Sequence, residues 1–214
     1  MLIHVGSTRP IHGWFHLSQP IPSDLRSAVG SWWRPRAKKA TAIYVEDGLE
    51  RLTIDDSLRF LRGCRRALTK TGTLRIRTTN LDWVFLRNCR PSTGSGEEAL
   101  EACLQGNLAF RRGGTEFLYN DSTLRAALRE AGFAHVSFVT PGHSETPELR
   151  RLESDENTTA PPDPPMFLIA EASGIGERTE IPRHLFSDMT QVTEWRLIAR
   201  WRAKIARILR RTGA

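Results

Sequence analysis

The feature that most constrains the fold is a strand, a helix and a strand in succession between residues 40 and 78. Ala40–Val45 is an apolar run of strand length. From about residue 53 to Thr69, apolar side chains recur with the helical period, and Gly72 is expected to end this helix. Thr73–Thr78 then alternates apolar and polar residues, as a strand does. Two strands joined by a helix favour a parallel pair, because the crossover returns the chain in the same direction.

The rest of the chain fits the same layered arrangement. Further strands are predicted at Leu2–Val5, Trp14–Leu17, His135–Thr140 and Met166–Ala172, and further helices at 81–89, 97–110, 121–131 and 191–211. Strands separated by helices indicate a largely parallel sheet with helices packed on it. The long loop before the last strand allows an antiparallel edge. We therefore expect an α/β fold with a mostly parallel sheet and an antiparallel edge.

Charge is distributed unevenly along the 214 residues. The formal net charge is +7, from 31 basic and 24 acidic residues. Seven basic residues and no acidic ones follow position 195, which leaves 24 basic residues to balance the 24 acidic ones elsewhere. We expect 191–214 to form a basic amphipathic helix that packs on a protein partner, on a second copy of the chain or on an anionic membrane surface. Nucleic acid is disfavoured because the body is formally neutral.

We predict a cytoplasmic protein with three segments. They are an α/β domain at 1–175, a linker at 176–190 and the C-terminal helix at 191–214. No apolar run approaches the roughly 18 residues that span a bilayer, and the N-terminus does not resemble a signal peptide. The protein would be peripheral to the membrane if the last helix binds lipid. The three cysteines are odd in number and lie far apart, so we expect neither a disulfide framework nor a metal site.

A series of segments keeps the order and spacing of motifs found in one enzyme family. These segments are Ile3–Thr8, His12–Ser18, Ile43–Leu52, Phe60–Ile76, Thr79–Asp82, Phe117–Asn120, Leu124–Phe133 and His143–Glu153. Together they resemble the small bacterial class I S-adenosylmethionine-dependent methyltransferases. The resemblance implies the Rossmann-like fold of that family, S-adenosylmethionine as cofactor, and transfer of a methyl group to an oxygen or nitrogen of a small-molecule substrate.

The resemblance also implies where the site lies. The cofactor would be bound at the carboxyl ends of strands, by residues Gly6, Ser7, Ser18, Glu46, Asp47, Leu49 and Asn80. Carboxylates there could hold the ribose or attract the cationic sulfonium, although a solvated loop with a capping carboxylate explains them equally well. His143 and Glu50 are the candidate catalytic bases. A serine hydrolase is disfavoured, because Ser144 lacks a G-x-S-x-G context.

The sequence departs from the family pattern at positions that contact the cofactor. Ser18 stands where an acidic residue usually accepts hydrogen bonds from the ribose, and Thr8 stands where a later glycine is usual. Arg51 replaces a histidine. Two functions therefore stay open: a methyltransferase, and a catalytically degenerate subunit of the same fold that serves as a binding or scaffolding partner. Binding of an S-adenosyl ligand would distinguish them.

Overall fold

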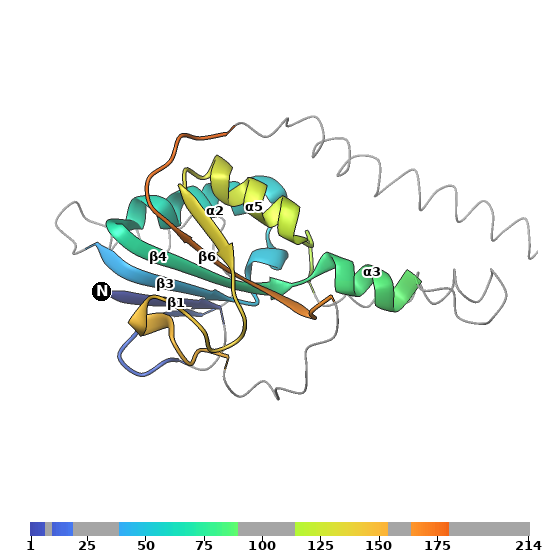
Figure 1. The fold of residues 1–214 in the computed structure, drawn as a ribbon, viewed down its shortest axis with the longest axis horizontal. Helices are drawn as coiled ribbons and strands as arrows, with labels where there is room; N and C mark the ends of the chain where they lie inside the picture. Colours follow the sequence, from blue (N-terminus) through green and yellow to red (C-terminus); the bar gives the residue numbers. More distant parts are fainter. Residues whose placement is uncertain (7–9, 19–38, 90–113, 154–163, 180–214) are drawn as a thin grey trace, which may run out of the picture. The chain divides into compact units, whose positions relative to one another are not determined.

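Six strands form one sheet in the order β2-β1-β3-β4-β6-β5. The strands are β1 (Leu2–Gly6), β2 (Phe15–Ser18), β3 (Ala40–Glu46), β4 (Leu68–Thr79), β5 (His135–Phe138) and β6 (Phe167–Ser173). Strands β1 to β4 are parallel, while β6 is antiparallel to both β4 and β5 (Figure 1). The structure confirms the predicted Rossmann-like α/β fold with a mostly parallel sheet and an antiparallel edge.

The computed structural model describes residues 1–6, 10–18, 39–89, 114–153 and 164–179. All of them belong to one unit of the chain, Met1–Thr179. The helices predicted at 97–110 and 191–211 lie outside the described residues, so the proposed partners of the C-terminal helix stay a prediction. No helix of the described segments combines the length and the apolar character needed to cross a membrane.

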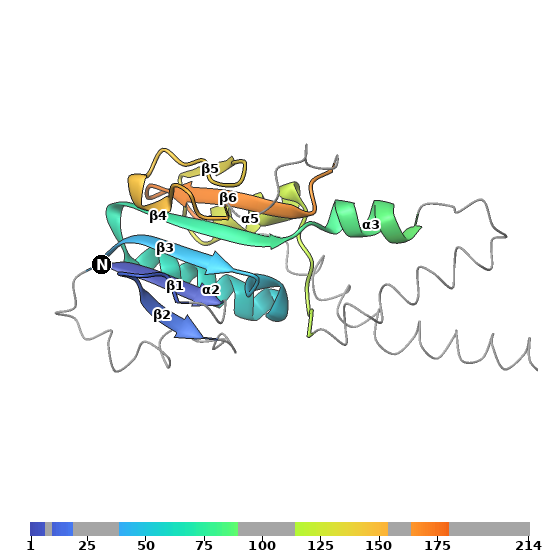
Figure 2. The same cartoon turned by 90° about the horizontal axis from the view of Figure 1, so that it is seen from below.

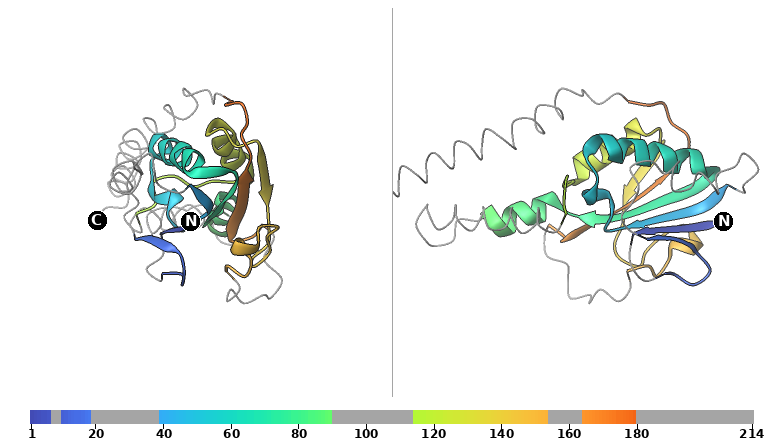
Figure 3. Two further views of the ribbon diagram at one scale, coloured as in Figure 1. Left: turned by 90° about the vertical axis from the view of Figure 1, so that its left-hand side faces the viewer. Right: turned by 180° about the vertical axis from the view of Figure 1, so that it is seen from behind.

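In the segments that the structure describes, three α-helices and two short 3-10 helices accompany the sheet. They are α2 (Ile54–Ala67), α3 (Leu81–Cys89), α5 (Asp121–Glu130), η1 (Leu49–Arg51) and η2 (Pro147–Leu149). Thr53 caps α2 by accepting a hydrogen bond from the backbone N–H of Asp56, and Asn120 and Thr123 form a capping box at the start of α5. Helices α2 and α5 lie on one side of the sheet and the segment containing η2 lies on the other (Figure 3).

The boundary between α2 and β4 differs from the prediction. The helix ends at Ala67 and the strand begins at Leu68, so Gly72 lies inside β4 rather than after the helix. The pairing of β3 with β4 shifts register between Ala40 and Ala42, opposite this glycine. A β-carbon at position 72 would lie 2.9 Å from the side chains of Leu68 and Thr69. Gly72 therefore accommodates a strand irregularity, a common role of glycine within strands.

The two faces of the sheet differ in chemistry. Successive side chains of a strand point to opposite faces, so the apolar Leu74 and Ile76 share one face and Arg75 and Arg77 share the other. The register aligns His4, Tyr44, Arg75 and Glu171 in one row across four strands. All four are buried. The face opposite α2 is therefore a buried polar surface rather than a solvent-exposed one.

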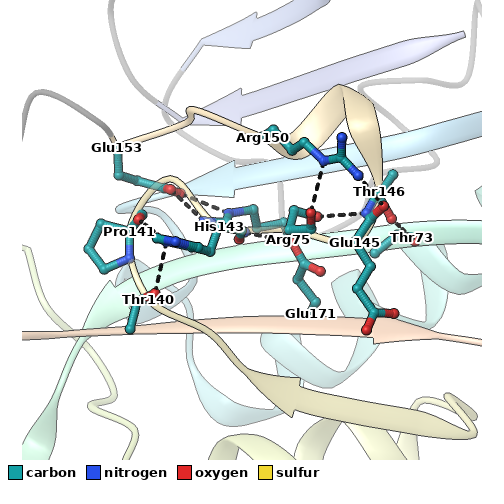
Figure 4. Close-up of polar contacts among 11 residues, drawn as sticks. Thr73, Arg75, Thr140, Pro141, His143, Glu145, Thr146, Arg150, Glu153 and Glu171 are labelled. Atoms are coloured by element: carbon teal, nitrogen blue, oxygen red, sulfur yellow. Dashed lines mark hydrogen bonds and ion pairs between the residues drawn. The ribbon is translucent and has the colours of Figure 1, made fainter.

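The segment after β5 is attached to this polar face by Arg75. The Arg75 guanidinium donates to both carboxylate oxygens of Glu153, at 3.0 and 2.6 Å, and to Glu171 at 2.6 Å. It also donates to the backbone carbonyl of His143 at 2.7 Å, and Figure 4 shows these contacts converging on the one side chain. Thr146 adds a hydroxyl contact of 2.9 Å with Thr73. Charge-assisted bonds therefore hold residues 143–153 against the sheet.

Candidate functional site

The strand order places a topological switch point between β1 and β3. Strand β1 pairs with β2 on one side and with β3 on the other, so successive connections wind in opposite directions from it. Ligands of open α/β sheets bind in the crevice beyond the carboxyl ends of the strands at such a point. Figure 2 shows β1 to β4 pointing the same way, so their carboxyl ends share one edge. The structure therefore indicates where a ligand site is to be sought.

Gly6 ends β1 at this edge in a conformation that requires glycine. Its φ is +125°, and a β-carbon there would lie 1.9 Å from the backbone oxygen of Glu46. The close approach is thus to β3, and the glycine is explained by strand packing. Ser18 is paired with Gly6 at the end of β2. The side chain of Ser18 and all of Ser7 lie outside the described residues.

Two carboxylates follow one another at the end of β3. Glu46 lies with a carboxylate oxygen 3.4 Å from Nε2 of the buried His4, and its side chain is 25% exposed. Asp47 forms an ion pair with Arg77, and its side chain is 41% exposed. Burial raises the pKa of Asp47, and the neighbouring Arg77 opposes that rise. The predicted pair of carboxylates is therefore present at the switch point, with each carboxylate near a basic side chain.

Backbone geometry fixes the position of Asp47. Its φ is +49°, a left-handed conformation that aspartate tolerates better than most residues. Its N–H donates to the carbonyl of Arg77 at 3.1 Å, which ties the turn to β4. Arg77 in turn lies 3.8 Å from the ring centroid of Phe167, a cation–π contact. Arg77 was not among the predicted site residues, and the only sequence signal for it is a charge near the carboxyl end of a strand.

Glu50 lies in η1 just beyond these carboxylates and is almost fully buried. Its carboxylate accepts a hydrogen bond from the Thr78 hydroxyl at 3.0 Å. Its backbone carbonyl accepts from the N–H groups of Glu116 and Phe117, at 2.7 and 3.1 Å. Burial raises the pKa of the Glu50 carboxyl above its usual range, against the opposing effect of its hydrogen bonds. A raised pKa in a buried carboxyl is the direction of shift that general acids and bases often show.

This environment predicts how stability depends on pH. A carboxyl whose folded-state pKa is raised contributes stability below its unfolded pKa of about 4.3, and that contribution is lost as pH rises through the folded value. We therefore expect Glu50→Gln to gain stability relative to the parent protein as pH rises from about 4 toward neutral. Denaturant unfolding across that range measures the difference. Glu145→Gln, at an exposed position, is the control, and a Glu50→Gln difference that does not vary with pH would contradict the expected titration.

Two other predicted site residues, Leu49 and Asn80, are buried at this edge of the sheet. Leu49 is fully buried, so its side chain belongs to the core. Asn80 is buried as well, and its side-chain oxygen accepts from the N–H of Asp82 at 3.0 Å, at the start of α3. Its side-chain nitrogen donates to the carbonyl of Pro165 at 2.9 Å. The Leu49 side chain packs in the core, and the Asn80 side chain bonds to neighbouring backbone groups, so both have structural roles at this edge.

The two candidate bases are not brought together. Glu50 bonds with Thr78, whereas the carbonyl of His143 bonds with Arg75. Thr78 and Arg75 are an odd number of residues apart on β4, so they point to opposite faces of the sheet. His143 is exposed, and its Nδ1 lies 3.1 Å from both the Thr140 hydroxyl and the Pro141 carbonyl (Figure 4). A joint role of these two residues in one proton transfer is therefore not supported by the fold.

Within the part of the chain that the structure describes, no group of three or more histidine, cysteine, aspartate or glutamate residues is arranged to hold a metal ion. Cys64 is buried, and burial raises the pKa of its thiol above the usual range. A thiol in this environment is a core side chain rather than a nucleophile.

No protein-family model matches the sequence, and no curated protein sequence matches it. Among solved structures, the chain is similar to a duf574 family protein from Streptomyces avermitilis, with 12% identity over 75% of this chain and 55% of that one and a TM-score of 0.44. It is similar to an O-methyltransferase family protein from Burkholderia thailandensis, with 11% identity, coverage of 76% and 37%, and a TM-score of 0.41. A third is LepI in complex with SAM, with 9% identity, coverage of 81% and 36%, and a TM-score of 0.38.

Proposed function

We propose that this chain binds S-adenosylmethionine at the switch point between β1 and β3 and transfers its methyl group to an oxygen or nitrogen of a small molecule. The observation that carries the proposal is the pair of partly exposed carboxylates, Glu46 and Asp47, at the carboxyl end of β3 beside the end of β1. This is the edge at which Rossmann-like sheets bind nucleoside-containing ligands.

The hydrogen-bond acceptors at this edge fit the cofactor. Carboxylate oxygens accept strong hydrogen bonds from hydroxyl groups such as those of a ribose. Their negative charge also favours a cationic sulfonium, and Arg77 offsets part of that charge at Asp47. When bound, S-adenosylmethionine supplies a methyl group that is already activated for transfer.

The chain's own residues would then bind the cofactor, align the methyl acceptor and remove its proton. In this proposal Asp47 accepts from the ribose while Arg77 and the left-handed turn hold its carboxylate in place, because a fixed acceptor costs less to order on binding. Glu50 is the favoured base, since its buried carboxyl lies three residues beyond Asp47, in η1, and has a raised pKa. Alignment of the acceptor with the methyl group supplies much of the rate enhancement in such reactions.

Two substitutions test the binding part of the proposal. Asp47→Asn and Glu46→Gln keep side-chain shape but remove charge, and a lost charge-assisted bond costs about 1.5–3 kcal/mol, or about tenfold or more in affinity. Isothermal titration with S-adenosylmethionine should show that loss in at least one variant. Glu145→Gln, which removes an exposed carboxylate outside this edge, should bind as the parent does.

The outcomes separate the two functional classes. Binding by the parent that weakens in Asp47→Asn or Glu46→Gln supports the methyltransferase proposal, and methyl transfer is then sought with small-molecule acceptors. Binding that is unchanged in both variants removes these carboxylates from the site. A parent protein that binds no S-adenosyl ligand would favour the catalytically degenerate binding or scaffolding subunit.

A further inference from the structure

A concave site lies at the edge of the sheet opposite the switch point, where β3 and β4 begin and α2 ends. It is a surface cavity of about 350 Å³. Its basic lining residues come from four parts of the chain: Lys39, Arg65, Arg66, Lys70 and Arg178. Leu68, Ala131 and Ile175 contribute apolar surface. Because parallel strands begin at one edge and end at the other, this cavity is separate from the switch point.

The charge of this cavity is not balanced by its own walls. Five basic residues line it, and no acidic residue is among those described there. Of the five, Arg178 has a carboxylate partner, Glu130, at 2.9 Å. That carboxylate is shared with Arg62, which also forms an ion pair with it. The cavity therefore carries a concentrated positive charge at the edge of a body whose formal charges cancel overall.

Arg65 shows the imbalance most clearly. Among the other partly or fully buried arginines, Arg62, Arg75 and Arg77 each pair with a carboxylate, and Arg125 donates to the backbone carbonyl of Val136. Among the described residues, Arg65 has no such partner: its Nε is buried without a hydrogen bond, and its guanidinium lies 5.7 Å from the ring centroid of Phe133. Burial lowers the pKa of Arg65. A buried, unsatisfied charged donor is costly, so an external acceptor at this place would be stabilising.

Helix chemistry explains only part of this cluster. Arg65 and Arg66 occupy the last turn of α2, where basic residues favourably oppose the helix dipole. That effect requires neither Lys39, which precedes β3, nor Lys70, which lies in β4. It also leaves the Arg65 Nε unsatisfied. Convergence of four chain segments on one concavity is the arrangement of a binding site.

We infer that this cavity binds a ligand bearing a phosphomonoester or pyrophosphate group. Arginine forks match phosphate oxygens in bidentate geometry, and lysine adds charge without directional demand. Several cations that have no carboxylate partner among the described residues suit a multiply charged anion better than a single carboxylate. The apolar residues Leu68 and Ile175 would contact the organic part of such a ligand, whether it is a soluble phosphorylated metabolite or the headgroup region of an anionic lipid.

The test uses the full chain and two phosphate probes. Inorganic pyrophosphate is titrated calorimetrically, and sedimentation is measured with phosphatidylcholine vesicles with and without phosphatidic acid. The double variant Arg65→Gln/Lys70→Gln should weaken binding about tenfold or more, since it removes two charged donors. Higher ionic strength should weaken binding by the parent. Lys70 is exposed, so Lys70→Gln alone keeps the fold and should weaken binding by a smaller factor.

A matched control removes the same charge elsewhere. Arg59 and Arg129 are exposed on α2 and α5 and do not line the cavity, so Arg59→Gln/Arg129→Gln should bind as the parent does. Pyrophosphate binding lost only in the cavity variants supports a soluble phosphate ligand. Binding to phosphatidic acid vesicles alone, weakened by the same variants, supports a lipid headgroup. Binding of neither probe, or equal losses in the cavity and control variants, overturns the inference.

Discussion

Replacement of Arg75 by methionine is expected to lower the free energy of unfolding by about 3–5 kcal/mol. The side chains of Arg75 and Glu153 are fully buried, and that of Glu171 is 9% exposed. Burial alone would lower the pKa of Arg75, but the hydrogen bonds and charges of Glu153 and Glu171 raise it above its ordinary value. Without the guanidinium, two carboxylates would remain buried with no cation between them. Denaturant unfolding with fixed slope measures the loss.

Two further variants separate the buried charge from simple loss of contacts. Arg59→Met removes an exposed arginine that pairs with Asp56, and pairs of that kind contribute about 0–1 kcal/mol. The triple variant Arg75→Met/Glu153→Leu/Glu171→Leu removes all three charges and should recover much of the lost stability, because apolar replacements of whole buried ion clusters are often neutral. An Arg75→Met protein as stable as Arg59→Met would show that the cluster is not buried in solution.

This cluster also shows where sequence-based prediction of the fold ends. The strands were predictable because alternation and apolar runs are local: β1 and β3 occur close to their predicted positions, and β4 contains the predicted Thr73–Thr78 but begins earlier, at Leu68. The alternation in Thr73–Thr78 would ordinarily indicate one solvated face. Here the polar face is buried, because residues 143–153 cover it and Glu153 and Glu171 neutralise Arg75. Contacts between residues 78 and 96 positions apart depend on register, which the local pattern does not encode.

For the candidate site, too, some features could be predicted from the sequence and others could not. Position along the chain was enough to place Gly6, Glu46 and Asp47 at the carboxyl ends of neighbouring strands, since the order of motifs resembles a known family. Side-chain partners were not predictable. Arg77 pairs with Asp47 at a turn where Asp47 itself is left-handed. His143 is separated from Glu50 because Arg75 and Thr78 point to opposite faces of β4.

The second large loss of stability is expected on substitution of Gly6. The substitution tests whether this glycine is needed for packing against β3 or for binding a ligand. An alanine there would combine an unfavourable φ with a β-carbon 1.9 Å from the backbone oxygen of Glu46. Strain and overpacking each cost about 1–3 kcal/mol, so Gly6→Ala should lose at least about 2 kcal/mol of unfolding free energy.

Gly13 is the matched control for Gly6, because its φ is also positive, at +80°, while nothing lies within 4 Å of the added carbon. Gly13→Ala should therefore lose only the conformational part, about 1–2 kcal/mol. Equal losses in the two variants would mean that conformation alone demands glycine at position 6. If Gly6→Ala instead kept its stability but lost affinity for S-adenosylmethionine, the glycine would serve the ligand. The 1.9 Å distance from the added β-carbon to the Glu46 backbone oxygen favours the structural role. Gly6 allows β1 to pack closely against β3, and that packing places the carboxylates of Glu46 and Asp47 beside the end of β1.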